Sequence, residues 1–183
     1  MRAIWLAAVL LSVLSGIGAA WAEERRTSLQ QTGDQRTREQ KTRDRQWAWC
    51  RGEEPAVLIR ACTALLQPGR ETPDGRARAF FNRGRAWSDQ GQYDKAIRDF
   101  DEAIRIDPRY PEAFNNRGIA LGGKGQRDRA IQDFDEAIRI DPNYAIALHN
   151  RALALRALGR MVEADADVAR ARQAGPRLTT TKE

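Results

Sequence analysis

Residues 77–110 read ARAFFNRGRAWSDQGQYDKAIRDFDEAIRIDPRY, and residues 111–144 read PEAFNNRGIALGGKGQRDRAIQDFDEAIRIDPNY. These two stretches are identical at 22 of 34 positions without a gap. Residues 145–178, AIALHNRALALRALGRMVEADADVARARQAGPRL, form a third and more divergent copy. Self-similarity at a fixed period of this length indicates a repeat architecture, in which each unit buries its apolar face only by stacking on its neighbours.

Each copy has the pattern of two short helices. A glycine at position 15 separates two stretches of helical periodicity, and a proline at position 32 ends the second stretch. Small residues at positions 8, 20 and 27 let the two helices approach closely, while large apolar residues at positions 4, 11 and 24 fill the space around them. These eight positions hold Phe80, Gly84, Trp87, Gly91, Ala96, Phe100, Ala103 and Pro108, then Phe114, Gly118, Leu121, Gly125, Ala130, Phe134, Ala137 and Pro142, then Leu148, Ala152, Leu155, Gly159, Ala164, Val168, Ala171 and Pro176.

The pattern resembles that of the tetratricopeptide repeat (TPR) family, over 102 of the 183 residues. The resemblance implies an all-α fold, a right-handed superhelical solenoid of three helix-turn-helix repeats. It also implies that the first helices of the repeats line a concave groove that binds a protein or peptide partner. In the family, positions 2, 5, 6, 9, 12 and 13 face that groove. The predicted groove residues are Arg78, Phe81, Asn82, Arg85, Asn115, Asn116, Ile119, His149, Asn150, Leu153 and Arg156.

An asparagine recurs at position 6 of every repeat in this predicted groove. An Asn side chain both donates and accepts hydrogen bonds, which suits the backbone of an extended peptide. Alternatively, these asparagines hold neighbouring turns or face water. Some family members grip a C-terminal carboxylate with Lys and Asn at positions 5 and 9, where the first repeat has Phe81 and Arg85. That clamp is therefore not predicted here.

Position 7, usually Leu in the family, is Arg in all three repeats, and position 23 is Asp in all three. A half-buried Arg needs a carboxylate partner, so the recurrence predicts structural ion pairs within or between repeats. The alternative is that these arginines bind anions. The residues concerned are Arg83, Asp99, Arg117, Asp133, Arg151 and Asp167. On the exposed side of the DFDEAI segments we expect pairs one helical turn apart, Asp101 with Arg105 and Asp135 with Arg139.

The N-terminus, residues 1–22, has the pattern of a secretory signal peptide. Arg2 precedes an uncharged apolar run, and small residues follow, ending in Ala20-Trp21-Ala22. We expect cleavage after Ala22 and a periplasmic or secreted protein. The alternative is an uncleaved anchor, since an apolar run of about 20 residues is long enough to span a bilayer. Contact with a membrane is expected only in that case.

Residues 23–46 are predicted to be a disordered polar linker or a transient helix. Leu29 is their one large apolar residue, so burial cannot offset the entropy of ordering them. We interpret the segment as a solvated tether, with contact to anionic envelope surfaces as the alternative.

Residues 47–76 form a predicted helical extension before the repeats. Pro55 suits the first turn of a helix, apolar residues then recur at helical spacing, and Pro68-Gly69 ends it. Export favours a disulfide between Cys50 and Cys62. Two buried thiols or a redox pair are the alternatives, although no C-x-x-C motif is present. The segment is similar to an N-terminal extension of exported bacterial members of the TPR family.

Composition narrows the classes of function. The net charge of +6 is a small difference between 31 basic and 25 acidic residues, and the arginines have acidic neighbours, so nucleic-acid binding is not predicted. The chain has one His and no recognisable nucleophile–base pair, so no catalytic residue, metal site or cofactor is predicted.

We expect a non-catalytic scaffold that binds a protein or peptide partner in the cell envelope. The alternative is a structural or assembly protein that forms a homo-oligomer through its C-terminal repeat. Only residues 179–183 follow that repeat, whereas arrays usually need a polar capping helix.

Overall fold

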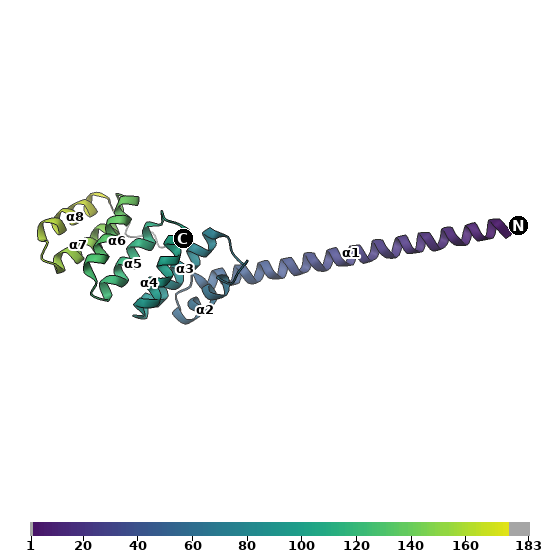
Figure 1. The fold of residues 1–183 in the computed structure, drawn as a ribbon, viewed down its shortest axis with the longest axis horizontal. Coiled ribbons are helices and arrows are strands. Elements are labelled where there is room, and N and C mark those ends of the chain that lie inside the picture. Colours follow the sequence, from purple (N-terminus) through teal and green to yellow (C-terminus); the bar gives the residue numbers. More distant parts are fainter. Residues whose placement is uncertain (1, 176–183) are drawn as a thin grey trace. The chain divides into compact units, whose positions relative to one another are not determined.

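The computed structural model describes the backbone of residues 2–175 and the side chains of Trp21 and of residues 23–175. The described residues form eight helices and no strand. The predicted tail, 179–183, and Pro176 at the end of the third repeat lie outside them. The chain divides into two compact units, residues 1–45 and 46–183 (Figure 1). The helices are α1 (Arg2–Cys50), α2 (Pro55–Leu65), α3 (Pro73–Asp89), α4 (Tyr93–Ile106), α5 (Pro111–Gly123), α6 (Arg127–Ile140), α7 (Ala145–Ala157) and α8 (Met161–Gln173).

The first unit lies within α1, which includes residues 23–46. The sequence predicts a disordered linker or a transient helix there, and the structure differs in describing a helix. Side-chain pairs one turn apart stabilise it locally, because Gln35 donates to Glu39 and Gln40 donates to Asp44. Among the described residues, no helix is both long and apolar enough to cross a membrane. Cleavage after Ala22 stays a prediction.

The second unit is a stack of helix pairs. Helices α3 and α4 form the first repeat, α5 and α6 the second, and α7 and α8 the third, and the second helix of each repeat packs on the first helix of the next (Figure 1). The tight turns inside the repeats place Gly91, Gly125 and Gly159 at φ values of 69°, 77° and 77°. Side chains disfavour this left-handed conformation, so glycine is needed at each turn. These elements confirm the predicted all-helical repeat fold.

A size match between two positions holds each repeat together. A Cβ atom added to Gly84 would lie 2.8 Å from Phe100 Cε1, and one added to Gly118 would lie 2.6 Å from Phe134 Cε1. The aromatic ring of the second helix therefore occupies the space that a side chain on the first helix would need. In the third repeat the same positions hold a larger and a smaller residue, Ala152 and Val168, which share one core cluster.

Helix α2 packs on α3, and the last residues of α1 join it through a disulfide and a shared core cluster, so that they form a further helix pair. Cys50 and Cys62 are joined by a disulfide with their Cα atoms 4.9 Å apart, which confirms the predicted bridge. Both cysteines are fully buried, in a cluster with Leu65 and Ala79. The bond closes a short loop, and a constraint of this size is worth roughly 3 kcal/mol in the chain-entropy model.

The arginines that recur at position 7 of the repeats join neighbouring helix pairs. Arg117 donates through Nε and Nη2 to the two carboxylate oxygens of Asp133, at 2.8 and 2.7 Å, and through Nη1 to Asp101 of the preceding repeat, at 2.6 Å. Arg151 makes the same three bonds to Asp167 and Asp135. The ion pairs with position 23 therefore lie within each repeat, and the third bond crosses to the repeat before.

The series formed by Arg83, Arg117 and Arg151 has different bonding partners at its two ends. Arg83 is paired with Asp99, but its Nη1 donates to the hydroxyl of Thr63 in α2, at 2.9 Å, instead of to a carboxylate. At the position of Asp101 and Asp135, the third repeat has Ala169. The bonds from a position-7 arginine to an aspartate of the preceding unit therefore occur only between the repeats: Arg117 to Asp101 and Arg151 to Asp135.

The expected pairing of Asp101 and Asp135 along their own helices is wrong. Arg105 donates to Glu102 instead, at 2.8 Å, and Arg139 donates to Glu136. The half-buried arginine of the next repeat competes for each aspartate, because it has lost more hydration than the exposed Arg105 or Arg139. The exposed arginines then pair with the adjacent glutamates.

We predict that Gly118→Ala lowers the free energy of unfolding by about 1–3 kcal/mol, because the new methyl group overlaps the Phe134 ring. Gly122→Ala in the same helix is the matched control, since nothing lies within 4 Å of its Cβ, and it should stabilise the helix by up to about 1 kcal/mol. Urea denaturation measures both. Adding Phe134→Val should cost much less in the Gly118→Ala background than in the wild type, and strictly additive effects would contradict the size match.

We predict that Asp133→Ala costs about 3–5 kcal/mol, because it leaves the half-buried guanidinium of Arg117 without its bidentate partner. Glu136→Gln, which breaks a largely exposed pair with Arg139 on the same helix, should change the stability by less than about 1 kcal/mol. Thermal and urea unfolding followed by circular dichroism measure both variants. Equal losses in the two would show that Asp133 has no special structural role.

Candidate functional site

The first helices of the three repeats share one face of the second unit. Helix α5 contacts both α3 and α7, so the residues predicted for the groove lie on adjacent helices. We call the exposed side of α3, α5 and α7 the first-helix face. Its exposed predicted residues are Arg78, Arg85, Ile119, His149, Leu153 and Arg156, and its half-buried ones are Phe81, Asn82, Asn116 and Asn150.

Two apolar side chains are exposed at the same repeat position on neighbouring helices. Ile119 on α5 is 41% exposed, and Leu153 on α7 is 51% exposed. The corresponding residue of the first repeat is Arg85, which forms no ion pair among the described residues. The row therefore changes along the face from a cation to two aliphatic side chains.

An aromatic cluster lies at the Arg85 end of this row. The rings of Phe81 and Tyr110 are 4.9 Å apart, and the Arg85 guanidinium lies 5.9 Å from the centre of the Phe81 ring. Burial and the nearby carboxylate of Glu112 raise the pKa of Tyr110, and the same two causes raise the pKa of Tyr144 to about 12. Both phenols therefore stay protonated at neutral pH and remain hydrogen-bond donors.

The sequence did not single out these two tyrosines. They occupy the last position of their repeats, directly before the first helix of the next repeat and outside the positions that the family places in its groove. Their recurrence in RIDP-x-Y in two repeats is the signal that points to them.

The asparagines on the first-helix face bond to the protein itself. Asn150 Nδ2 donates to Asn115 Oδ1 at 2.9 Å, across the contact of α7 with α5. Asn116 Nδ2 donates to the backbone oxygen of Glu112 at 2.8 Å, and Asn82 Nδ2 lies 4.0 Å from Cys50 Sγ. Asn115 is only 2% exposed, so its predicted place in a groove is wrong: it packs between helices, where Asn150 satisfies its amide oxygen.

Other charges of the face are already paired. Arg78 donates to Asp74 one turn earlier, and Arg156 donates to Asp165 of α8 at 2.8 Å. Within the described part of the chain, no group of three or more His, Cys, Asp or Glu side chains is placed to hold a metal ion. The first-helix face thus offers apolar contact, Arg85, Glu112 and two phenols.

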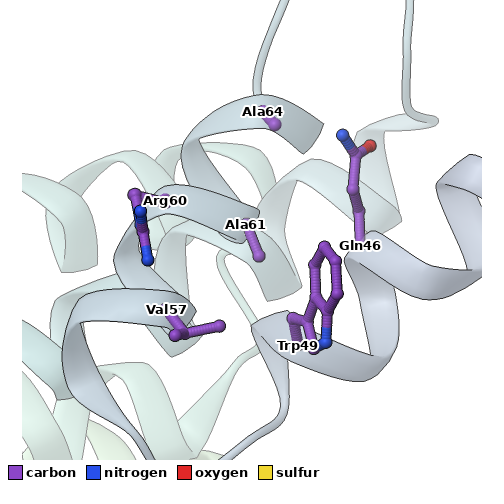
Figure 2. Close-up of a pocket in the computed structure, with 6 residues that line it drawn as sticks. All are labelled: Gln46, Trp49, Val57, Arg60, Ala61 and Ala64. Carbon is purple, nitrogen blue, oxygen red and sulfur yellow. The ribbon is translucent and has the colours of Figure 1, made fainter.

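A separate apolar cavity of about 520 Å³ lies between the end of α1 and α2. Figure 2 shows the Trp49 indole on one wall, with Val57 and Ala61 of α2 across from it. Gln46, Arg60 and Ala64 complete the lining. The cavity belongs to the disulfide-linked helix pair, and the sequence did not predict it.

The repeats match known families over most of their length. A TPR repeat model matches residues 84–125, and two tetratricopeptide repeat models match residues 111–144 and 134–166. No curated protein shows significant sequence similarity to the chain.

Several solved structures have a similar fold. The crystal structure of MamA has 23% identity and a TM-score of 0.59, over 66% of this chain and 68% of MamA. The Arabidopsis OM64 TPR domain has 26% identity and a TM-score of 0.56, over 58% of this chain and 88% of that domain. The first TPR of Spaghetti (RPAP3), bound to the HSP90 peptide SRMEEVD, has 27% identity and a TM-score of 0.55, over 57% of this chain and 82% of that domain.

The in-register repeats, the stacking of helix pairs, the family models and these structures agree. The repeats of this chain, matched over residues 84–166, are tetratricopeptide repeats.

Proposed function

We propose that the protein is a non-catalytic scaffold that binds a protein or peptide partner on its first-helix face. TPR domains commonly mediate protein–protein interactions, and the similar Spaghetti domain is described with a bound peptide. The observation that carries the proposal is the exposure of Ile119 and Leu153 on neighbouring helices. Apolar side chains held on rigid helices are favourable contacts for a partner, because burying them costs little conformational entropy.

The polar groups at the Arg85 end of the face give such a contact its direction. Arg85 offers a cation, Glu112 offers a carboxylate, and the protonated phenols of Tyr110 and Tyr144 offer donors. A partner that places apolar side chains on Ile119 and Leu153 meets these groups at one end only. The partner's orientation along the face is then set by polar contacts and its affinity by apolar contacts.

We further propose that the protein acts in the cell envelope or outside the cell. The signal-like pattern before Glu23 supports this location, and so does the Cys50–Cys62 disulfide, because disulfides persist mainly in oxidising compartments.

Expression of the full chain in a Gram-negative host should yield a periplasmic protein that begins at Glu23. N-terminal sequencing of the osmotic-shock fraction measures this, and Ala22→Arg should leave the precursor uncleaved. A full-length chain retained with the cells in both cases would contradict the predicted export.

The second candidate function is self-association through the third repeat. The turn between α7 and α8 and the start of α8 expose three apolar side chains: Leu158, Met161 and Val162. Val162 is 85% exposed, which favours a contact at this end of the array.

One cross-linking experiment separates the two candidates. We predict that the mature protein, cross-linked in its native envelope fraction, captures a partner that Ile119→Ser/Leu153→Ser weakens at least about tenfold, since apolar anchors at interfaces are worth about 1 kcal/mol or more each. Met161→Ser/Val162→Ser is the matched control, because it removes two exposed apolar side chains from another surface. If the protein cross-links only to other copies of itself, and Met161→Ser/Val162→Ser alone abolishes this product, self-association is favoured and the binding proposal is overturned.

A further inference from the structure

The first repeat has a crevice that the other two repeats do not share in composition. It lies between α3 and α4, has a volume of about 610 Å³ and includes Phe80, Trp87, Lys95 and Arg98 in its lining. A second cavity of about 430 Å³ is also lined by Lys95 and Arg98, together with Asp94 and Lys124. The two cations therefore stand between two adjoining hollows, which we call the Trp87 crevice.

The repeats themselves show how unusual this site is. Position 11 is Trp87 in the first repeat but Leu121 and Leu155 in the others, and both leucines are only 2% exposed, whereas Trp87 is partly exposed. Arg98 is replaced by Gln132 and Ala166 in the later repeats. Leucine fills position 11 in the later repeats, whereas the larger indole of Trp87 packs against the cluster of Ala96 and Phe100 and still leaves part of its surface exposed at the crevice.

The carboxylates around the crevice are already paired with other cations. Arg83 bonds Asp99, Arg117 bonds Asp101, Arg105 bonds Glu102, and Lys124 bonds Asp94. In contrast, neither Lys95 nor Arg98 forms an ion pair among the described residues. The Lys95 ammonium instead lies over the Trp87 ring, 4.3 Å from its centre. Arg98 acts electrostatically on Asp94, but that carboxylate already pairs with Lys124, so Lys95 and Arg98 can both bind an anionic group from outside.

We propose that the Trp87 crevice binds an acidic segment of a partner protein. A carboxylate of that segment lies between Lys95 and Arg98, and a neighbouring apolar side chain lies against Phe80 and Trp87. The lining carboxylates already have cationic partners of their own, so the carboxylates of an acidic segment bind at Lys95 and Arg98 while its apolar side chain contacts the aromatic wall. This surface is distinct from the first-helix face, so it is a second docking site.

The test uses the full mature chain and the labelled peptide fluorescein-EEFEE-amide, with QQFQQ and KKFKK as sequence controls. Fluorescence anisotropy at low salt should show binding of EEFEE alone. Lys95→Gln/Arg98→Gln should weaken it at least about tenfold, because each charge-assisted bond is strong compared with a neutral one. Trp87→Leu, which installs the residue of the second repeat, should weaken it several-fold while keeping the fold intact.

Two matched variants make the result specific. Arg127→Gln/Arg129→Gln removes the same net charge from the second repeat and should bind EEFEE like the wild type. Ile119→Ser/Leu153→Ser should also bind normally, so failure of the first-helix proposal is distinguishable from failure of this one. Absence of EEFEE binding by the wild type would overturn the proposal. So would a loss in the Arg127→Gln/Arg129→Gln variant equal to that in Lys95→Gln/Arg98→Gln, because it would indicate general charge attraction.

Discussion

A guanidinium held between two aspartates is the interaction on which the stacking of the repeats depends. Arg117 has bidentate contact with Asp133 of its own repeat and a third bond to Asp101 of the preceding one. Such a group contributes little net free energy when formed, because both partners lose hydration, but removing one partner leaves an uncompensated charge. The bond therefore favours one relative placement of neighbouring helix pairs over others.

Packing inside each helix pair follows a complementary rule. Glycine faces phenylalanine in the first two repeats, and alanine and valine share a core cluster in the third, so the combined volume at the contact changes little. In the pair before the repeats, the Cys50–Cys62 disulfide takes this role and fixes the helix spacing covalently. The solenoid thus begins with a covalent contact and continues with contacts based on size. The candidate binding surfaces lie on helices whose spacing is set in these ways.

Sequence patterns predicted the parts of this structure that repeat or that have a local cause. The glycine turns, the helix ends near proline, the disulfide and the Arg–Asp pairs inside each repeat all follow from residues at fixed positions. The partner of Asp101 was not predictable from its own helix, since Arg117 comes from the next one. Likewise, the burial of Asn115 depends on Asn150 of a neighbouring repeat. The charged and apolar groups of the Trp87 crevice are brought together only by the packing of α3 on α4.

The series of position-7 arginines has a direction, because Arg83, Arg117 and Arg151 each donate a hydrogen bond to the helix pair that precedes their own. It begins at a neutral hydroxyl, Thr63, and the third repeat has Ala169 where a following arginine would seek a carboxylate. Only the middle repeat both donates such a bond to the repeat before it, through Arg117, and accepts one from the repeat after it, through Asp135. A duplicated copy of residues 111–144 inserted beside the original would therefore find all its partners, and lengthening of the array by internal duplication is easier than by addition after the third repeat.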